Sequence, residues 1–199
     1  MTSAVREFDR RVEPGLALVD DAAGIAAACH AMALRFHRGG KLVVFGNGGG
    51  ATDAEHIAVE FVHPVIVGKR ALPALSLAED LATVTGIARR DGFGEVFAHQ
   101  VRHLADPADI ALGISPDGEC ENVRRGLEMA HSLGLLTIAL TGGDGGAIAR
   151  SPAVEHPFVV SSDDACVVKE MHVTVYHVLW ELVHVFFEQP GILGPAVVR

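Results

Sequence analysis

The sequence predicts an α/β fold in which helices cover both faces of a five-stranded parallel sheet. Short, continuously apolar runs alternate along the chain with segments of helical spacing, and three of the runs end in glycine-containing loops. Strands that are apolar on both faces are typical of parallel sheets buried between two helical layers. The predicted strands cover residues 42–45, 74–77, 110–114, 135–140 and 157–160.

The helices are predicted from apolar periodicity and from their end signals. Apolar residues recur at helical spacing from Leu16 to about Phe36, so we expect an N-terminal helical segment over about 1–39 that Gly39 and Gly40 close. The last helix is apolar on all sides, which predicts that it is shared with another subunit. The other predicted helices cover about 52–62, about 121–133 and, from the capping sequence 161–164, a final stretch to about Glu188, where residues 189–191 stop it.

The composition is that of an ordinary folded protein. The chain has 199 residues, of which 49% are hydrophobic and 21% are charged, so disordered and low-complexity classes are excluded. We identify no internal linker and predict a single domain over residues 1–199. The formal net charge of −9 argues against a general nucleic-acid or anionic-membrane surface.

The sequence also predicts where the protein resides. No apolar stretch is long enough for a membrane span, and the N-terminal residues lack the apolar core of a signal peptide. Cys29, Cys120 and Cys166 are an odd number without a CxxC pair, which indicates neither a disulfide framework nor a thiolate zinc site. We therefore expect a protein of the reducing cytoplasm that binds neither nucleic acid nor a membrane.

The glycine-containing loops mark the expected ligand site. Ligands of parallel α/β sheets bind beyond the carboxyl ends of the strands, so the loops at 46–52, 115–120 and 141–146 are expected to converge. The first loop reads Gly-Asn-Gly-Gly-Gly, which is neither the dinucleotide-binding fingerprint nor a Walker motif.

Histidines and a glutamate on two helices are candidates for chemistry. His56 and Glu60 are four residues apart and share a helical face, and in the last helix His177 shares a face with His184 but not with His172. Two histidines and a glutamate are adequate ligands for Zn²⁺ with an open position. The alternative is a surface His–Glu hydrogen bond together with buried, hydrogen-bonded histidines.

Several motifs in order resemble one known family. They are the loop and helix start at 46–56, the segments 72–77, 94–97, 113–115 and 139–146, and residues 170–172 with His177. In this order and at these spacings, over about residues 40 to 185, they resemble the phosphoheptose isomerase branch of the SIS (sugar isomerase) domain family.

The resemblance implies a three-layer SIS domain around a five-stranded parallel sheet, usually a homotetramer with active sites between subunits. It implies aldose–ketose isomerisation of sedoheptulose 7-phosphate and glycero-manno-heptose 7-phosphate, often with bound zinc. By position, His56, Glu60 and His177 match the family's zinc ligands, and Glu60 and His177 match its catalytic acid–base residues. The chemistry needs a base that moves a proton between adjacent carbons and an acid or metal that stabilises the enediolate.

The phosphate-binding loops depart from the family's pattern. Gly50 replaces the serine of the family's GNGGS loop, and the family's STSGNS loop reads Ser-Pro-Asp-Gly-Glu-Cys at 115–120. Two carboxylates in this loop repel a phosphate dianion, and a helix N-terminus offsets only about 1 kcal/mol of that repulsion. The matching substrate-binding candidates that remain are Asn47, Gly48, Gly49 and Ser115.

Three positively charged residues occupy other family positions. The family's substrate-contacting Asn-Asp pair falls at Arg89 and Arg90, which either bind an anion at a shifted place, or are solvated or paired with Asp117 and Glu119. The glutamine that completes the family's zinc site falls at Lys169, and a protonated lysine does not ligate zinc. Lys169 therefore leaves the expected zinc site incomplete, and either replaces the metal as electrophile or holds an anionic substrate.

Two classes of function stay open at this point. The first is a carbohydrate-derivative-binding isomerase, which the joint presence of His56, Glu60 and His177 favours. The second is a non-catalytic SIS homologue that serves as a protein-binding or ligand-sensing module, which the altered phosphate loop favours. Either class is expected to be a homo-oligomer, a dimer or a tetramer.

Overall fold

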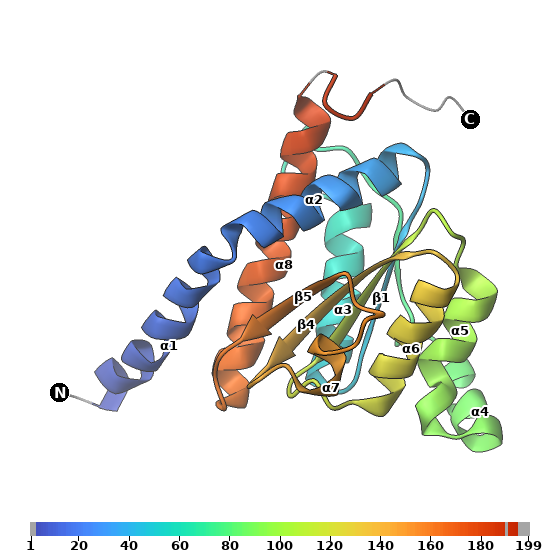
Figure 1. Cartoon of the computed structure of the whole chain (residues 1–199), viewed down its shortest axis with the longest axis horizontal. Coiled ribbons are helices and arrows are strands. Elements are labelled where there is room, and N and C mark those ends of the chain that lie inside the picture. Colours follow the sequence, from blue (N-terminus) through green and yellow to red (C-terminus); the bar gives the residue numbers. More distant parts are fainter. Residues whose placement is uncertain (1–2, 190, 195–199) are drawn as a thin grey trace.

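The computed structural model describes residues 3–189 and 191–194 and contains a five-stranded sheet between two layers of helices (Figure 1). The strands lie in the order β2-β1-β3-β4-β5, and all neighbouring strands pair in parallel. The α/β fold and the five predicted strands are confirmed, with ends shifted by one or two residues. The bounds are β1 (Leu42–Gly46), β2 (Ala74–Ser76), β3 (Ile110–Ser115), β4 (Leu136–Gly142) and β5 (His156–Val160).

Each face of the sheet has its own apolar core, because successive side chains of a strand point to opposite faces. In β1, Leu42 and Val44 pack into the core shared with one helical layer, whereas Val43 and Phe45 pack into the core on the other face. The first layer consists of α2 (Ala22–His37), α3 (Gly49–Val62) and α8 (Ala165–Glu188). The second consists of α4 (Leu81–Asp91), α5 (Val96–Leu104) and α6 (Glu121–Ser132), and the short helices Phe93–Glu95 and α7 (Gly146–Ala149) complete the fold.

The N-terminal segment corrects the prediction of one helix from Leu16 to about Phe36. It forms two helices, α1 (Ser3–Asp20) and α2, which meet at Asp21. Aspartate is disfavoured inside helices, and Asp21 takes the N-cap position of α2, although its side chain makes no capping hydrogen bond. Among the described residues no single helix is long and apolar enough to span a membrane, although α1 and α2, joined at a bend of 64°, have the length and composition for it when taken together.

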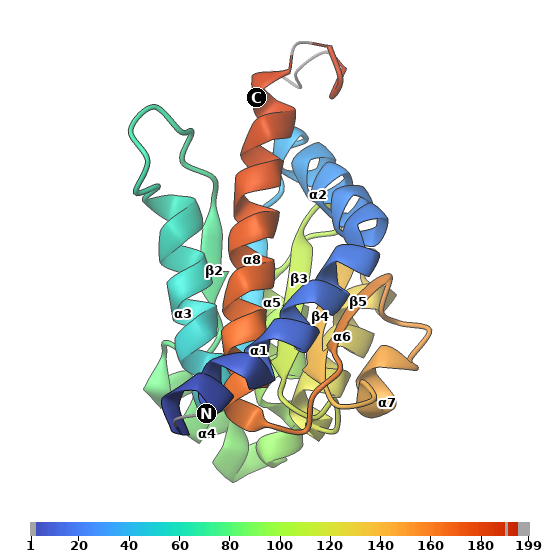
Figure 2. The same cartoon turned by 90° about the vertical axis from the view of Figure 1, so that its left-hand side faces the viewer.

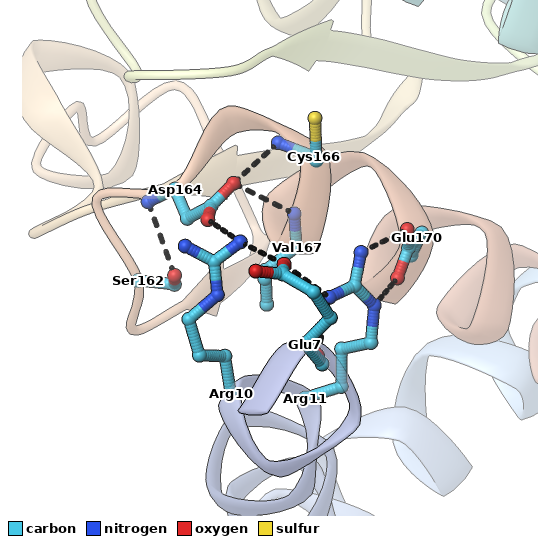
Figure 3. A network of polar contacts seen from close by, with 8 residues as sticks. All are labelled: Glu7, Arg10, Arg11, Ser162, Asp164, Cys166, Val167 and Glu170. Atoms are coloured by element: carbon cyan, nitrogen blue, oxygen red, sulfur yellow. Dashed lines mark hydrogen bonds and ion pairs between the residues drawn. The ribbon is translucent and has the colours of Figure 1, made fainter. Parts of the chain in front are cut away.

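Ion pairs hold α1 against the start of α8 (Figure 3). Arg10 lies 3.0 Å from the Asp164 carboxylate, and Arg11 lies 2.6 Å from Glu170. Helix α1 has no buried residue; Leu18 packs half-buried against the core, and five other large apolar side chains are exposed. These exposed side chains are Val5, Phe8, Val12, Leu16 and Val19.

Helix α8 runs along the molecule between α2 and α3 (Figure 2). As predicted from the capping sequence, the Asp164 carboxylate accepts hydrogen bonds from the N–H groups of Cys166 and Val167. Contacts with α1, α2, α3 and the sheet account within the chain for much of the apolar content that predicted a shared helix. The helix ends at Glu188, and Pro190 of the predicted stop lies outside the described residues.

Candidate active site

The loops at the carboxyl edge of the sheet converge as expected. The side-chain amides of Asn47 and Asn122 exchange two hydrogen bonds, of 2.8 and 2.9 Å, between the first loop and α6. A Cβ at Gly142 would lie 2.3 Å from the Pro116 carbonyl oxygen, so only glycine allows the second and third loops to approach this closely. The Ile148 N–H donates to the Gly118 carbonyl at 3.0 Å.

The first loop leads directly into helix α3, which begins at Gly49 rather than at the predicted residue 52. Gly48 has a φ of +53°, a conformation that favours glycine, and it occupies the N-cap position. The backbone therefore reverses between β1 and α3 in a turn too tight for larger residues. A Cβ at Gly46 would lie 2.9 Å from the carbonyl oxygens of Gly50 and Ile114.

The structure brings His56, Glu60 and His177 together, two turns beyond that loop. Their potential ligand atoms all lie within 4.8 Å of one another, and His56 Nε2 lies 3.3 Å from Glu60 Oε1. The two imidazole rings meet edge to face with centroids 5.4 Å apart. Two imidazoles and one carboxylate are the donor set of many catalytic zinc sites, in which a fourth position stays open, so these residues fit the ion.

The other two histidines of α8 have structural surroundings. His172 is buried and its Nε2 lies 3.1 Å from the Thr141 carbonyl oxygen, and burial lowers the pKa of this imidazole. His184 is buried between the carbonyl oxygens of Trp180 and Arg70. His172 and His184 are therefore buried, hydrogen-bonded histidines, as the structural alternative in the sequence analysis predicted.

Two aromatic residues of α8 contact the cluster and were not identified from the sequence. The Tyr176 hydroxyl lies 2.8 Å from His56 Nδ1, and the Trp180 indole N–H donates to the Glu60 carbonyl at 2.9 Å. Burial, followed by the charges of Asp53 and Glu60, raises the pKa of Tyr176, so the phenol stays protonated. The chain has one tyrosine and one tryptophan, and this rarity is the feature of the sequence that could have marked both residues as candidates for the site.

Lys169 lies at the first loop, where its ammonium group is hydrogen-bonded and does not serve as a zinc ligand. Its ammonium nitrogen is 2.7 Å from Asp53 Oδ1 and 2.9 Å from the Gly49 carbonyl oxygen, with the Thr52 hydroxyl at 3.5 Å. Asp53, a third residue that was not identified from the sequence, has a side chain only 8% exposed. A buried carboxylate needs a partner, and Lys169 supplies it from the other helix.

A small cavity opens beside this ion pair, with a volume of about 230 Å³. Lys169 and Asp53 form its charged wall, and backbone of the first loop forms another. The Lys169 side chain is 45% exposed, so its ammonium is accessible from the solvent side. The lining residues are Gly49, Gly50, Asp53, Ile114, Pro116, Ala165, Val168, Lys169 and His172.

The side chains of Ser115, Asp117 and Glu119 in the loop at 115–120 are hydrogen-bonded within the loop or to residues of α7 and its end. The Ser115 hydroxyl donates to Asp117 Oδ1 at 3.1 Å and accepts from the Cys120 N–H at 3.2 Å. Glu119 accepts from the Ala147 N–H at 2.9 Å and lies 3.6 Å from Arg150. Ser115 therefore has its hydroxyl proton engaged by a carboxylate.

Arg89 and Arg90 lie in the last turn of α4 and are exposed. Arg90 forms an ion pair of 2.7 Å with its neighbour Asp91. In the described part of the chain neither arginine bonds to the loops at 46–52 or 115–120. Of the alternatives, pairing with Asp117 and Glu119 is wrong, because Arg150 contacts Glu119 and Asp91 pairs with Arg90, whereas the exposed positions of both arginines agree with solvated side chains.

Comparison with known proteins identifies relatives over most of the chain. Residues 11–142 match the SIS domain family. A phosphoheptose isomerase from Solidesulfovibrio magneticus is 40% identical over 88% of this chain and 85% of its own length, and one from Aquifex aeolicus is 44% identical over 82% and 81%.

Solved structures agree with the sequence relatives. A phosphoheptose isomerase from Francisella tularensis superposes with a TM-score of 0.85 at 32% identity, covering 92% of this chain and 99% of that one. The enzyme from Neisseria gonorrhoeae gives 0.83 at 28% identity, covering 90% and 96%. The chain belongs to the SIS domain family and, within it, to the phosphoheptose isomerase branch.

Proposed function

We propose that this chain is an isomerase that interconverts the aldose and ketose forms of a phosphorylated sugar, a phosphoheptose or a related carbohydrate. The observation that carries the proposal is the His56–Glu60–His177 cluster between α3 and α8, two turns beyond the first loop. The phosphoheptose isomerases of S. magneticus and A. aeolicus, at 40% and 44% identity, support the same reaction class.

Glu60 and His177 divide the proton transfers between them. Glu60 is held by its helix one turn from His56, and its carboxylate takes the proton from the carbon next to the substrate carbonyl and returns it to the adjacent carbon. His177, on the opposite helix, exchanges a proton with the substrate oxygens as the enediol forms and collapses. Their placement on two packed helices fixes both groups on one side of the substrate.

Zn²⁺ is proposed as the bound metal, held by His56, Glu60 and His177. When bound, it would stabilise negative charge on the carbonyl and hydroxyl oxygens of the substrate. Lys169 adds no ligand, and because its ammonium is tied to Asp53 and Gly49, it leaves the fourth position open. The proposed site thus has three protein ligands and lacks the fourth of the family's pattern.

Lys169 is the proposed anchor for anionic or hydroxyl oxygens of the substrate. Two of its three N–H donors are used at 2.7 and 2.9 Å, and the third has only the distant Thr52 hydroxyl at 3.5 Å. The loop residues Gly48 and Gly49 keep the backbone thin where the sugar approaches, and Asn47 is fixed by Asn122. Ser115, Arg89 and Arg90 have weaker support, because Ser115 and Arg90 bond to carboxylates nearby and Arg89 lies outside both loops.

We further propose a cytoplasmic homo-oligomer. The apolar stripe of α1 has five exposed side chains at helical spacing, and nothing among residues 3–189 and 191–194 covers them, which favours a second copy as their cover. A tetramer, the usual state implied by the family resemblance, is the specific form proposed.

The test is an NMR-monitored incubation of the purified chain with sedoheptulose 7-phosphate, with and without added Zn²⁺. Conversion to heptose phosphates by the wild type but not by a Glu60→Gln variant is expected. A matched Glu55→Gln variant, which changes an exposed glutamate of the same helix, should keep its activity. Binding without turnover would instead support the ligand-sensing alternative, and neither binding nor turnover would overturn the proposal.

A further inference from the structure

Tyr176 lies behind the cluster, in contact with both of its histidines. Its side chain is 2% exposed, and its ring centroid is 5.5 Å from that of His56 and 4.7 Å from that of His177. The hydroxyl is directed at His56 Nδ1, at 2.8 Å. The tyrosine is therefore placed to orient the histidine and is too deeply buried to contact solvent itself.

Hydrogen-bond chemistry explains why a phenol suits this place. The Glu60 carboxylate only accepts, so without a metal His56 donates through Nε2 and its Nδ1 must accept, with the Tyr176 hydroxyl as donor. If Nε2 held a cation, the ring proton would have to be on Nδ1, which would then donate to the phenol oxygen. A hydroxyl serves both arrangements, because it donates and accepts.

The adjacent turn of α3 is secured by a related contact. The Glu60 carbonyl would normally accept from the N–H four residues later, but that residue is Pro64, which has none. The Trp180 indole N–H supplies the missing donor at 2.9 Å. Two side chains one turn apart on α8 thus hold the His56 ring and the Glu60 backbone from the same side.

We infer that Tyr176 is a positioning residue that fixes the orientation and tautomer of His56 and thereby raises the affinity of the His56–Glu60–His177 cluster for a divalent cation. The inference deepens the proposed function, since it rests on the cluster as a metal site. Partners of this kind behind a histidine ligand change metal affinity by about 10- to 100-fold.

The experiment compares wild type with Tyr176→Phe, which keeps the ring and removes only the hydroxyl. Zn²⁺ affinity is measured by competition with a chromophoric chelator, and the ¹⁵N shifts of the His56 ring are followed by NMR without and with Zn²⁺. Thr137→Val is the matched control, because it removes a buried hydroxyl bonded to Ala153 outside the cluster. Thermal melts verify that each variant is folded.

We expect Tyr176→Phe to bind Zn²⁺ about 10- to 100-fold more weakly, with His56 in a mixture of tautomers, while Thr137→Val keeps the wild-type affinity. The inference is overturned if Tyr176→Phe binds within twofold of wild type with an unchanged His56 spectrum, or if wild type shows no Zn²⁺-dependent change at His56. Neither readout uses a sugar, so a missing isomerase activity would not affect the result.

Discussion

Two regions of the candidate site, one between α3 and α8 and one in a loop at the carboxyl edge of the sheet, differ in how they present their polar groups. Between α3 and α8, His56, Glu60 and His177 face one another with their ligand atoms within 4.8 Å. In the loop at 115–120, the polar groups bond among themselves and to Arg150. The first region offers side chains to a ligand, whereas the second has its hydroxyl and its carboxylates already engaged.

Because of this difference, we expect the first region to affect the proton transfer and the second to affect how tightly a phosphate is bound. In the proposed reaction, the carboxylate and imidazole of the first region move a proton between carbons. Holding a phosphate needs unengaged donors, and in the second region the Ser115 hydroxyl is engaged by a carboxylate. The comparison therefore predicts large effects of substitutions in the cluster and effects on affinity from the loop and Lys169.

The largest effect is expected from Glu60→Gln, which removes the proposed base. Turnover should fall by about 100- to 10,000-fold, because general-base catalysis contributes rate enhancements of that size. The melting temperature should stay near that of wild type, since the amide fits the same space. Steady-state kinetics and a thermal melt check both, and retained turnover would break the assignment of chemistry to this region.

A smaller effect is expected from Lys169→Gln, which introduces the residue of the family's pattern. Losing a charged donor should raise KM for a phosphosugar by about tenfold or more, with kcat changed less. Zn²⁺ affinity, measured by chelator competition, should rise, because an amide oxygen can ligate zinc. An unchanged KM would show that Lys169 only neutralises Asp53.

Substitutions in the loop at 115–120 are expected to have the opposite effect, which is tighter binding of a phosphosugar. In Asp117→Ser/Glu119→Ser, the Ser115 hydroxyl loses its carboxylate acceptor and the local negative charge falls, so KM for a phosphosugar should decrease several-fold. Asp144→Ser, which removes a carboxylate that pairs with Arg150 outside this loop, is the control. Equal effects in both variants would assign the change to net charge rather than to the loop.

The smallest effect concerns the start of α8, which leads from the loop edge to the cluster. The Cys166 N–H, then the Val167 N–H and Arg10, hold the pKa of Asp164 below its ordinary value (Figure 3). A lowered folded-state pKa means that this stabilisation is present above about pH 4 and is lost as the pH falls through the lowered value.

Asp164→Ala should accordingly lower the melting temperature by a few degrees at pH 7, and the difference from wild type should shrink in acid. Asp164→Ser keeps an N-cap acceptor without the charge and should recover most of the loss at pH 7. Melting curves from pH 7 to pH 3 test this, and a difference that grows in acid would contradict it.

The fold could be predicted largely from sequence because buried parallel strands give continuous apolar runs that glycine loops interrupt. The helical segment over about 1–39 was predicted, but its break at Asp21 was missed because the apolar period continues across it. In the site, His56 and Glu60 follow from helical spacing.

Contacts between distant segments were not predictable in the same way. The pairs Asp53–Lys169 and His56–Tyr176 join residues 116 and 120 positions apart, and no local pattern records such a contact. The loop was predicted to repel phosphate from its charges, but the engagement of Glu119 by Arg150 depends on how α7 packs.

The central claim is that Glu60 abstracts a carbon-bound proton of a phosphosugar, and solvent exchange tests it most directly. The chain is incubated in D₂O with sedoheptulose 7-phosphate, and deuterium at C1 and C2 is followed by NMR, for wild type and for Glu60→Gln. The account predicts deuterium incorporation by wild type and none by the variant. Equal incorporation by both, or none by either, would contradict it.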